Sequence, residues 1–134
     1  MNNLETKSSM LYSSEKYTEI TLIDLPKISL NEWYSGNHWT KRQAIKIKYK
    51  WLVKSQFKGV FSKENEYEVT YLFEFKSNPL DCSNCVAMVK LVEDIIFESD
   101  IPKIVKSVTI LSIKGKSDKL TIKIKEICKH SLIN

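Results

Sequence analysis

Three acidic side chains and one lysine stand around an expected helix in the second half of the chain. Asp81 comes at the start of this helix, Lys90 and Asp94 lie inside it, and Asp100 follows its end. Carboxylates are the ligands that Mg²⁺ prefers, and a nearby lysine stabilises the charge that builds on a phosphate oxygen during strand cleavage. The set indicates metal-dependent chemistry on nucleic acid. The alternative is that Asp81 or Ser83 only caps the helix and the other acids are solvated.

The chain around these acids is basic, which favours an anionic partner. Its 134 residues include 21 Lys and Arg against 16 Asp and Glu, giving a formal net charge of +5. A helix expected from Thr40 to about Lys58 carries seven positive charges and no acid. Basic side chains bind phosphates, although a lysine-rich helix face is often just solvated. We expect this helix to bind DNA through Lys41, Arg42, Lys46, Lys50 and Lys54.

Residues 28–39, directly before the basic helix, are rich in aromatic and polar side chains. Trp33, Tyr34, His38 and Trp39 belong to this segment, which we expect to be a loop. Aromatic rings beside positive charge stack on bases while the charge holds phosphates. This pattern adds His38 and Trp39 to the expected DNA-binding residues. The alternative is that the aromatic rings cover one end of the core.

The cysteines allow two interpretations. Cys82 and Cys85 form a Cys-x-x-Cys pair, and Cys128 with His130 would complete a zinc site. A lone pair of this kind is a weak signal, and the second spacing is not that of a zinc finger. We therefore expect ordinary free thiols, which fits a reducing compartment.

The apolar periodicity predicts an α+β fold, with a mixed sheet and two main helices packed on it as a single domain. Strands are expected over 17–24, 66–76, 104–113 and 120–128, the last two joined as a hairpin by 114–119. The core should include alternate residues of the second strand, Tyr67, Val69, Tyr71, Phe73 and Phe75.

The helices should complete this core. In the basic helix we expect an inward stripe of Ala44, Ile47, Trp51 and Ser55, broadened by Ile45, Tyr49 and Leu52. In a second helix, over about 84–97, the residues expected to point inward are Cys85, Met88, Val89, Val92 and Ile96.

The ends of the chain suggest a tail and one folded domain. Residues 1–16 are polar and are expected to be a flexible tail, and 17–130 the domain. No segment has the apolar length of a membrane span or of a signal-peptide core. We expect a cytoplasmic protein with no membrane partner.

Three segments together resemble the RusA family of Holliday junction resolvases, small endodeoxyribonucleases common in phages and prophages. They are residues 78–84, 88–94 and 99–105, and the run 29–42 is similar to the N-terminal part of phage members. The resemblance covers roughly residues 28–125. Asp81 matches the first acidic ligand, Lys90 the essential lysine and Asp100 the acid before a strand. Asn84 and Asp94 match the motif's Asn and helical Asp.

The resemblance implies a RusA-like nuclease domain that acts as a homodimer in a bacterial or phage-infected cell. It would cut four-way DNA junctions by paired symmetric nicks, using Mg²⁺ or alternatively Mn²⁺. Catalytic residues would be Asp81, Lys90 and Asp100, with Asp81, Asp94 and Asp100 as metal ligands. Ser83 and Ser99 stand where the family usually has further acids. A noncatalytic protein that binds branched or single-stranded DNA on the same fold is therefore the alternative.

Overall fold

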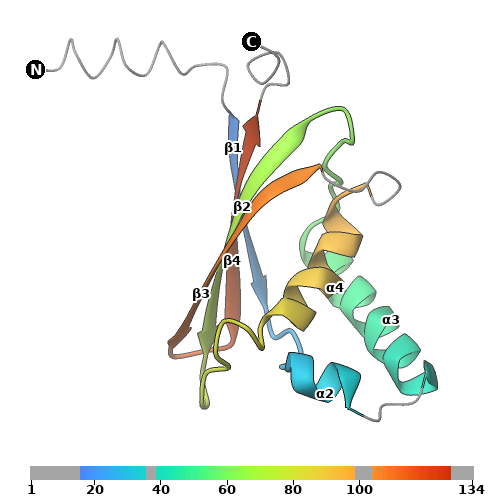
Figure 1. Ribbon diagram of the computed structural model, residues 1–134, viewed down its shortest axis with the longest axis vertical. Coiled ribbons are helices and arrows are strands. Elements are labelled where there is room, and N and C mark those ends of the chain that lie inside the picture. Colours follow the sequence, from blue (N-terminus) through green and yellow to red (C-terminus); the bar gives the residue numbers. More distant parts are fainter. Residues whose placement is uncertain (1–15, 36–38, 99–103, 128–134) are drawn as a thin grey trace, which may run out of the picture.

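The computed structural model describes residues 16–35, 39–98 and 104–127. Four strands form one mixed sheet, in the order β1-β4-β2-β3. Three helices, α2, α3 and α4, lie on one side of it (Figure 1). The bounds of the elements are β1 Lys16–Ile23, α2 Leu30–Tyr34, α3 Trp39–Gln56, β2 Glu66–Phe75, α4 Val86–Ile96, β3 Val105–Lys114 and β4 Lys119–Ile127. The expected α+β class, mixed sheet and single domain are confirmed.

The core lies between the sheet and the helices. Alternate residues of β2, from Tyr67 to Phe75, are buried as expected. Ile20 and Leu22 of β1 point to the same side, while Tyr17 is exposed on the other face. All five residues expected to point inward from the second helix are buried, together with Ala87 and Leu91. The period-2 and helical patterns therefore located most of the core correctly.

The predicted hairpin between the last two strands is wrong, because β2 lies between them. β2 pairs with β3 in parallel and with β4 in antiparallel orientation. Residues 115–118 instead cross the end of β2, where the Gly115 amide donates to the Phe75 carbonyl and the Lys76 amide donates to Asp118 Oδ1. A Cβ at Gly115 would lie 3.0 Å from the Glu74 Cβ, so a glycine suits this crossing.

The inward face predicted for the basic helix is right for Ile45, Tyr49 and Leu52 and wrong for its central stripe. Tyr49 and Val53 are fully buried, with Ile45 and Leu52 partly buried beside them. Ile47 and Trp51, expected to face the core, are 56% and 76% exposed. Both stripes have helical spacing, and only contact with β1 and α4 selects between them. The Tyr49 hydroxyl donates to the Pro26 carbonyl, and Gln56 bonds the backbone of Ile23 through both ends of its amide.

The aromatic segment expected as a loop contains the short helix α2. Ser29 accepts from the Glu32 amide, and Glu32 accepts from the Ser29 amide, which is a complete capping box. The Ser-x-x-Glu spacing signals such a helix start, and the sequence analysis missed it.

Residues 1–15 and 128–134 lie outside the described part, and Lys16 already belongs to β1 rather than to the expected tail. Among the described residues, no helix is long and apolar enough to cross a membrane.

Candidate nucleic-acid interface

A cleft between α2, α3 and α4 brings together three of the predicted site residues. Lys46 of α3 faces Lys90 and Asp94 of α4 across it, and the other lining residues are Leu30, Trp33, Tyr34, Ala87 and Leu91. Its volume is about 120 Å³, below the roughly 300–1,000 Å³ of a pocket for a small organic molecule. The cleft therefore suits a small group such as one phosphate rather than a whole enclosed ligand.

Helix α4 positions Lys90 and Asp94 by leaving only a narrow strip exposed. Six of its eleven residues are buried against the sheet and the other helices. Lys90 and Asp94 are four positions apart, so both lie on the strip that faces the cleft. The burial of the apolar residues of α4 thus holds Lys90 and Asp94 at the cleft.

Arg42 adds a third positive charge beside the aromatic wall of the cleft. Its guanidinium lies 5.7 Å from the ring centroid of Trp33 and 5.7 Å from that of Tyr34. Cation–π contacts of this kind hold a guanidinium in place while leaving it charged. Its Nε is buried and has no hydrogen-bond partner among the described residues. Trp33 and Tyr34 thus line a charged cleft, and Trp33 also packs on the core.

Asp81 lies away from this cleft, in the turn before α4. Its Oδ1 accepts a hydrogen bond of 2.9 Å from the Asn84 amide. Asn84 in turn accepts from the Leu30 amide through its carbonyl and from the Asn31 amide through its side chain. The carboxylate therefore stabilises the turn that holds α2 against the start of α4. This contact agrees with the capping alternative, although the N-cap of α4 itself is Cys85.

The expected metal ligands are spread along α4. Val86 to Asp94 spans about 12 Å of helix rise, and Asp81 precedes Val86 by another turn. Two oxygens on one Mg²⁺, each about 2.1 Å from it, lie far closer together than that. Asp100 lies outside the described residues, and among those described no group of three or more metal-ligating side chains gathers. The three-carboxylate set stays a prediction.

Glu93 is a half-buried acid next to the cleft residue Asp94, and no prediction was made for it from the sequence. It accepts a hydrogen bond of 2.9 Å from the hydroxyl of the fully buried Tyr71. Burial raises the pKa of Glu93, and the neighbouring Asp94 raises it further, against the opposing effects of Tyr71 and Lys90. An acid at an inward helical position opposite a strand tyrosine was the signal that could have found it.

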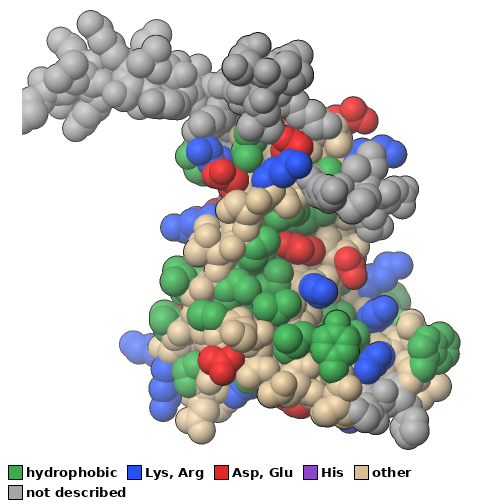
Figure 2. Space-filling model, in the orientation of Figure 1, with side chains coloured by type: hydrophobic (Ala, Val, Ile, Leu, Met, Phe, Trp, Pro, Cys, Tyr) green, Lys and Arg blue, Asp and Glu red, His purple; other side chains and the backbone are tan. Residues whose placement is uncertain are grey.

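The remaining predicted DNA-binding residues lie on or next to α3. Trp39 is 72% exposed, Lys41 is exposed, and His38 is outside the described residues. Lys50 and Lys54 line a hollow on the outer side of α3 together with Ile47 and Trp51. Figure 2 shows blue basic side chains interleaved with green apolar ones over the helical side of the molecule. The basic helix is therefore solvent-facing over most of its length.

The two described cysteines are free thiols. Cys82 is exposed and Cys85 is buried. Burial raises the pKa of Cys85 to about 11, so this thiol is protonated at neutral pH and is a poor nucleophile and metal ligand. Cys128 and His130, the other half of the zinc alternative, lie outside the described residues.

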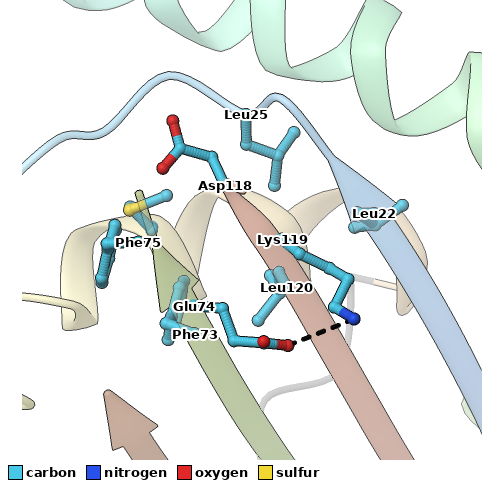
Figure 3. Close-up of a pocket in the computed structure, with 9 residues that line it drawn as sticks. Leu22, Leu25, Phe73, Glu74, Phe75, Asp118, Lys119 and Leu120 are labelled. Atoms are coloured by element: carbon cyan, nitrogen blue, oxygen red, sulfur yellow. Dashed lines mark ion pairs between the residues drawn. The ribbon is translucent and has the colours of Figure 1, made fainter. Parts of the chain in front are cut away.

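A second hollow, at the end of the sheet, is lined mostly by core side chains. Phe73, Phe75, Leu22, Leu25 and Leu120 surround it, and Glu74 pairs with Lys119 at its rim (Figure 3). Its volume of about 10 Å³ is that of roughly one water molecule. This hollow is a packing feature rather than a binding site.

No protein-family model matches the chain. A search of curated proteins also finds no significant relative.

Proposed function

We propose that the protein is a metal-dependent endodeoxyribonuclease that resolves four-way DNA junctions by paired symmetric nicks. The observation that carries the proposal is the cleft in which Lys46, Lys90 and Asp94 meet beside Arg42. Cations held around one acid are what a phosphodiester and its activating metal require. The RusA-like pattern assigns Lys90 and Asp94 on independent grounds, from their spacing in the sequence.

The lysines of the cleft would bind the scissile phosphate. Lys46 and Lys90 come from different helices, so a phosphate between them is held from two sides. Arg42 is held in place by its two aromatic neighbours. Their combined charge would neutralise the oxygen on which negative charge builds as the strand breaks.

Asp94 fits one part of a magnesium site. It is exposed and lines the cleft, and Mg²⁺ is usually held by one or two carboxylates together with waters and substrate phosphates. Bound there, Mg²⁺ would supply an activated water and a counter-charge for the phosphate. Asp81 and Asp100 are proposed as ligands on the resemblance alone. Asp81 lies too far from Asp94 in one chain to share its ion, so it would hold a metal separately at the start of α4. A homodimer is proposed because two symmetric nicks require two related sites.

The decisive test is incubation of an end-labelled four-way junction with the protein and Mg²⁺, followed by mapping of the nicks. We expect symmetric pairs of nicks, and a loss of at least about 100-fold in cleavage rate for Asp94→Asn and Lys90→Ala. Glu64→Gln changes an exposed acid outside the cleft and is the matched control. Cleavage by Asp94→Asn at the wild-type rate would show that this carboxylate holds no metal.

Asp81→Asn distinguishes the two ends of α4. Loss of cleavage in Asp81→Asn but not in Asp94→Asn would place the metal at the start of the helix instead. Ser83→Asp restores an acid that the family pattern expects, and we expect it to raise metal affinity or activity.

The second candidate function is noncatalytic binding of branched or single-stranded DNA. The basic, aromatic surface of α3 favours it, because that surface needs no metal. A wild-type protein that binds junctions tightly but cuts none of them with Mg²⁺ or Mn²⁺ would establish this function.

A further inference from the structure

The outer side of α3 carries an exposed tryptophan, Trp51, whose indole is not part of the core. Ile47, Lys50, Trp51 and Lys54 have the spacing i, i+3, i+4 and i+7, which places them on one face of the helix. They line a hollow that is open to solvent. Trp51 is the most exposed large hydrophobic side chain of the described residues, at 76%.

The helix cannot turn to bury this indole. Tyr49 and Val53 are fully buried on the opposite side. The Tyr49 hydroxyl and the Gln56 amide are bonded to the backbone at Pro26 and Ile23, which fixes the rotation of α3. Trp51 therefore contributes little to the core, and its indole is accessible to a partner from solvent.

The charge around Trp51 selects the class of partner. Helix α3 carries six positive charges, from Lys41 to Lys54, and no acid. A second copy of this face would bring lysines against lysines, and a cationic partner would be repelled. A lipid surface requires a wide apolar face, whereas only Ile47 and Trp51 project between the lysines. An anionic partner with flat apolar rings matches both features, and single-stranded nucleic acid has both.

We propose that Trp51 stacks on an unpaired base while Lys50 and Lys54 hold the flanking phosphates. This inference rests on the proposed DNA-binding function and adds to it a site for unpaired bases outside the cleft. Lys46, Lys50 and Lys54 follow one another at intervals of about 6 Å along the helix. The same row of lysines therefore leads from the hollow to the cleft, where Lys46 faces Lys90.

The test uses the fluorescence of Trp51 in the full chain. The protein has three tryptophans, so Trp33→Phe with Trp39→Phe leaves Trp51 as the sole indole. Titration with an oligothymidylate should quench its emission, and added salt should reverse the quenching. In an otherwise wild-type protein, Trp51→Ala should lower affinity for the oligothymidylate by roughly 10- to 100-fold, whereas Trp51→Phe should retain most of it. Affinity for blunt duplex should change little in Trp51→Ala.

Tyr17→Ala is the matched control, because Tyr17 is 70% exposed on β1, on the other face of the sheet. It should leave oligothymidylate affinity unchanged. Two results together would overturn this inference while leaving junction binding in place. They are Trp51 emission that the oligothymidylate does not quench in the variant with a single tryptophan, and normal oligothymidylate affinity in Trp51→Ala. If the wild type binds neither junction nor oligothymidylate, both the inference and the proposed function are rejected.

Two further measurements exclude other occupants of the hollow. Vesicles of phosphatidylserine and phosphatidylcholine should not shift the Trp51 emission, and a shift with vesicles but not with oligothymidylate would assign the face to membranes. Sedimentation of wild type and Trp51→Ala should give the same mass. A dimer that is lost in Trp51→Ala would instead make this face an interface between copies of the chain.

Discussion

Helices α3 and α4 lie side by side but serve opposite purposes. Helix α4 buries six of its eleven residues, whereas α3 buries two of its eighteen. Of these two helices, α4 therefore contributes more of the packing free energy. Helix α3 is held by one narrow face and a few hydrogen bonds. An amphipathic pattern alone therefore does not reveal how many residues of a helix are buried. The surplus apolar residues of α3 are available for binding.

The largest effect should be on the free energy of unfolding, which a substitution in α4 should lower far more than the same substitution in α3. Ile96→Ala in α4 removes a fully buried side chain and should lower the free energy of unfolding by about 2–5 kcal/mol. Ile47→Ala in α3 removes the same atoms from an exposed position and should change it by less than about 0.5 kcal/mol. Urea denaturation of both variants measures the difference. Equal losses would mean that the hollow on α3 belongs to the core.

The second-largest effect should show whether DNA binding depends on the lysines of α3 or on those of the sheet. Reversal of Lys46, Lys50 and Lys54 to Glu should weaken junction binding by at least about 100-fold, without metal, because three phosphate contacts become repulsive. The control reverses Lys114, Lys116 and Lys123, which are exposed on or next to the sheet. Both variants change the net charge equally. Equal weakening in a gel-shift titration would mean that binding follows total charge and not α3.

The third effect concerns the junction of α4 with the sheet. The pKa of Glu93 is raised in the folded protein, mainly by burial, so the folded state holds this proton more tightly than the unfolded state. Its contribution to stability is then fully present below the unfolded pKa and is lost as the pH rises through the folded pKa.

Glu93→Gln keeps an acceptor for Tyr71 and removes this dependence. Its thermal midpoint should exceed that of the wild type at pH 8, and the difference should shrink toward about pH 4. A constant difference across this pH range would contradict the assignment to Glu93.

The smallest effect is expected from chelation. Cys85 is buried and protonated, and we expect the thiols and His130 to form no structural zinc site. Addition of a chelator should leave the thermal midpoint almost unchanged. A large drop, together with one zinc per chain in metal analysis, would make α4 depend on a metal at its start.

The sequence allowed the layers of the fold to be predicted but not the neighbours within the sheet. The alternation of Tyr67 to Phe75 and the helical spacing from Met88 to Ile96 each indicate a buried face from local pattern alone. The position of β2 between β3 and β4 depends on long-range pairing, which no local pattern encodes. The inward stripe predicted for α3 wrongly included Ile47 and Trp51 beside Tyr49 for the same reason, because both faces are apolar.

The candidate site was predictable in part. The spacing of Lys90 and Asp94 placed them on one helix face, and their meeting with Lys46 required the packing of α3 on α4. Trp33 and Tyr34 were noted as stacking candidates, but their contacts with Arg42 depend on the short helix α2. Glu93 was missed because its burial depends on Tyr71, which is 22 residues away in the chain.

The crossing of residues 115–118 over the end of β2 has a consequence for how the chain acquires its structure. β3 and β4 are neighbours in sequence, yet each forms its ladder with β2. No quick local hairpin can therefore nucleate the sheet, and loop closure over long separations must come first. On a ribosome, β2 emerges with the five apolar side chains that it later buries and with two open edges, before either flanking strand exists. While β2 is exposed in this way during synthesis, the chain is prone to aggregate.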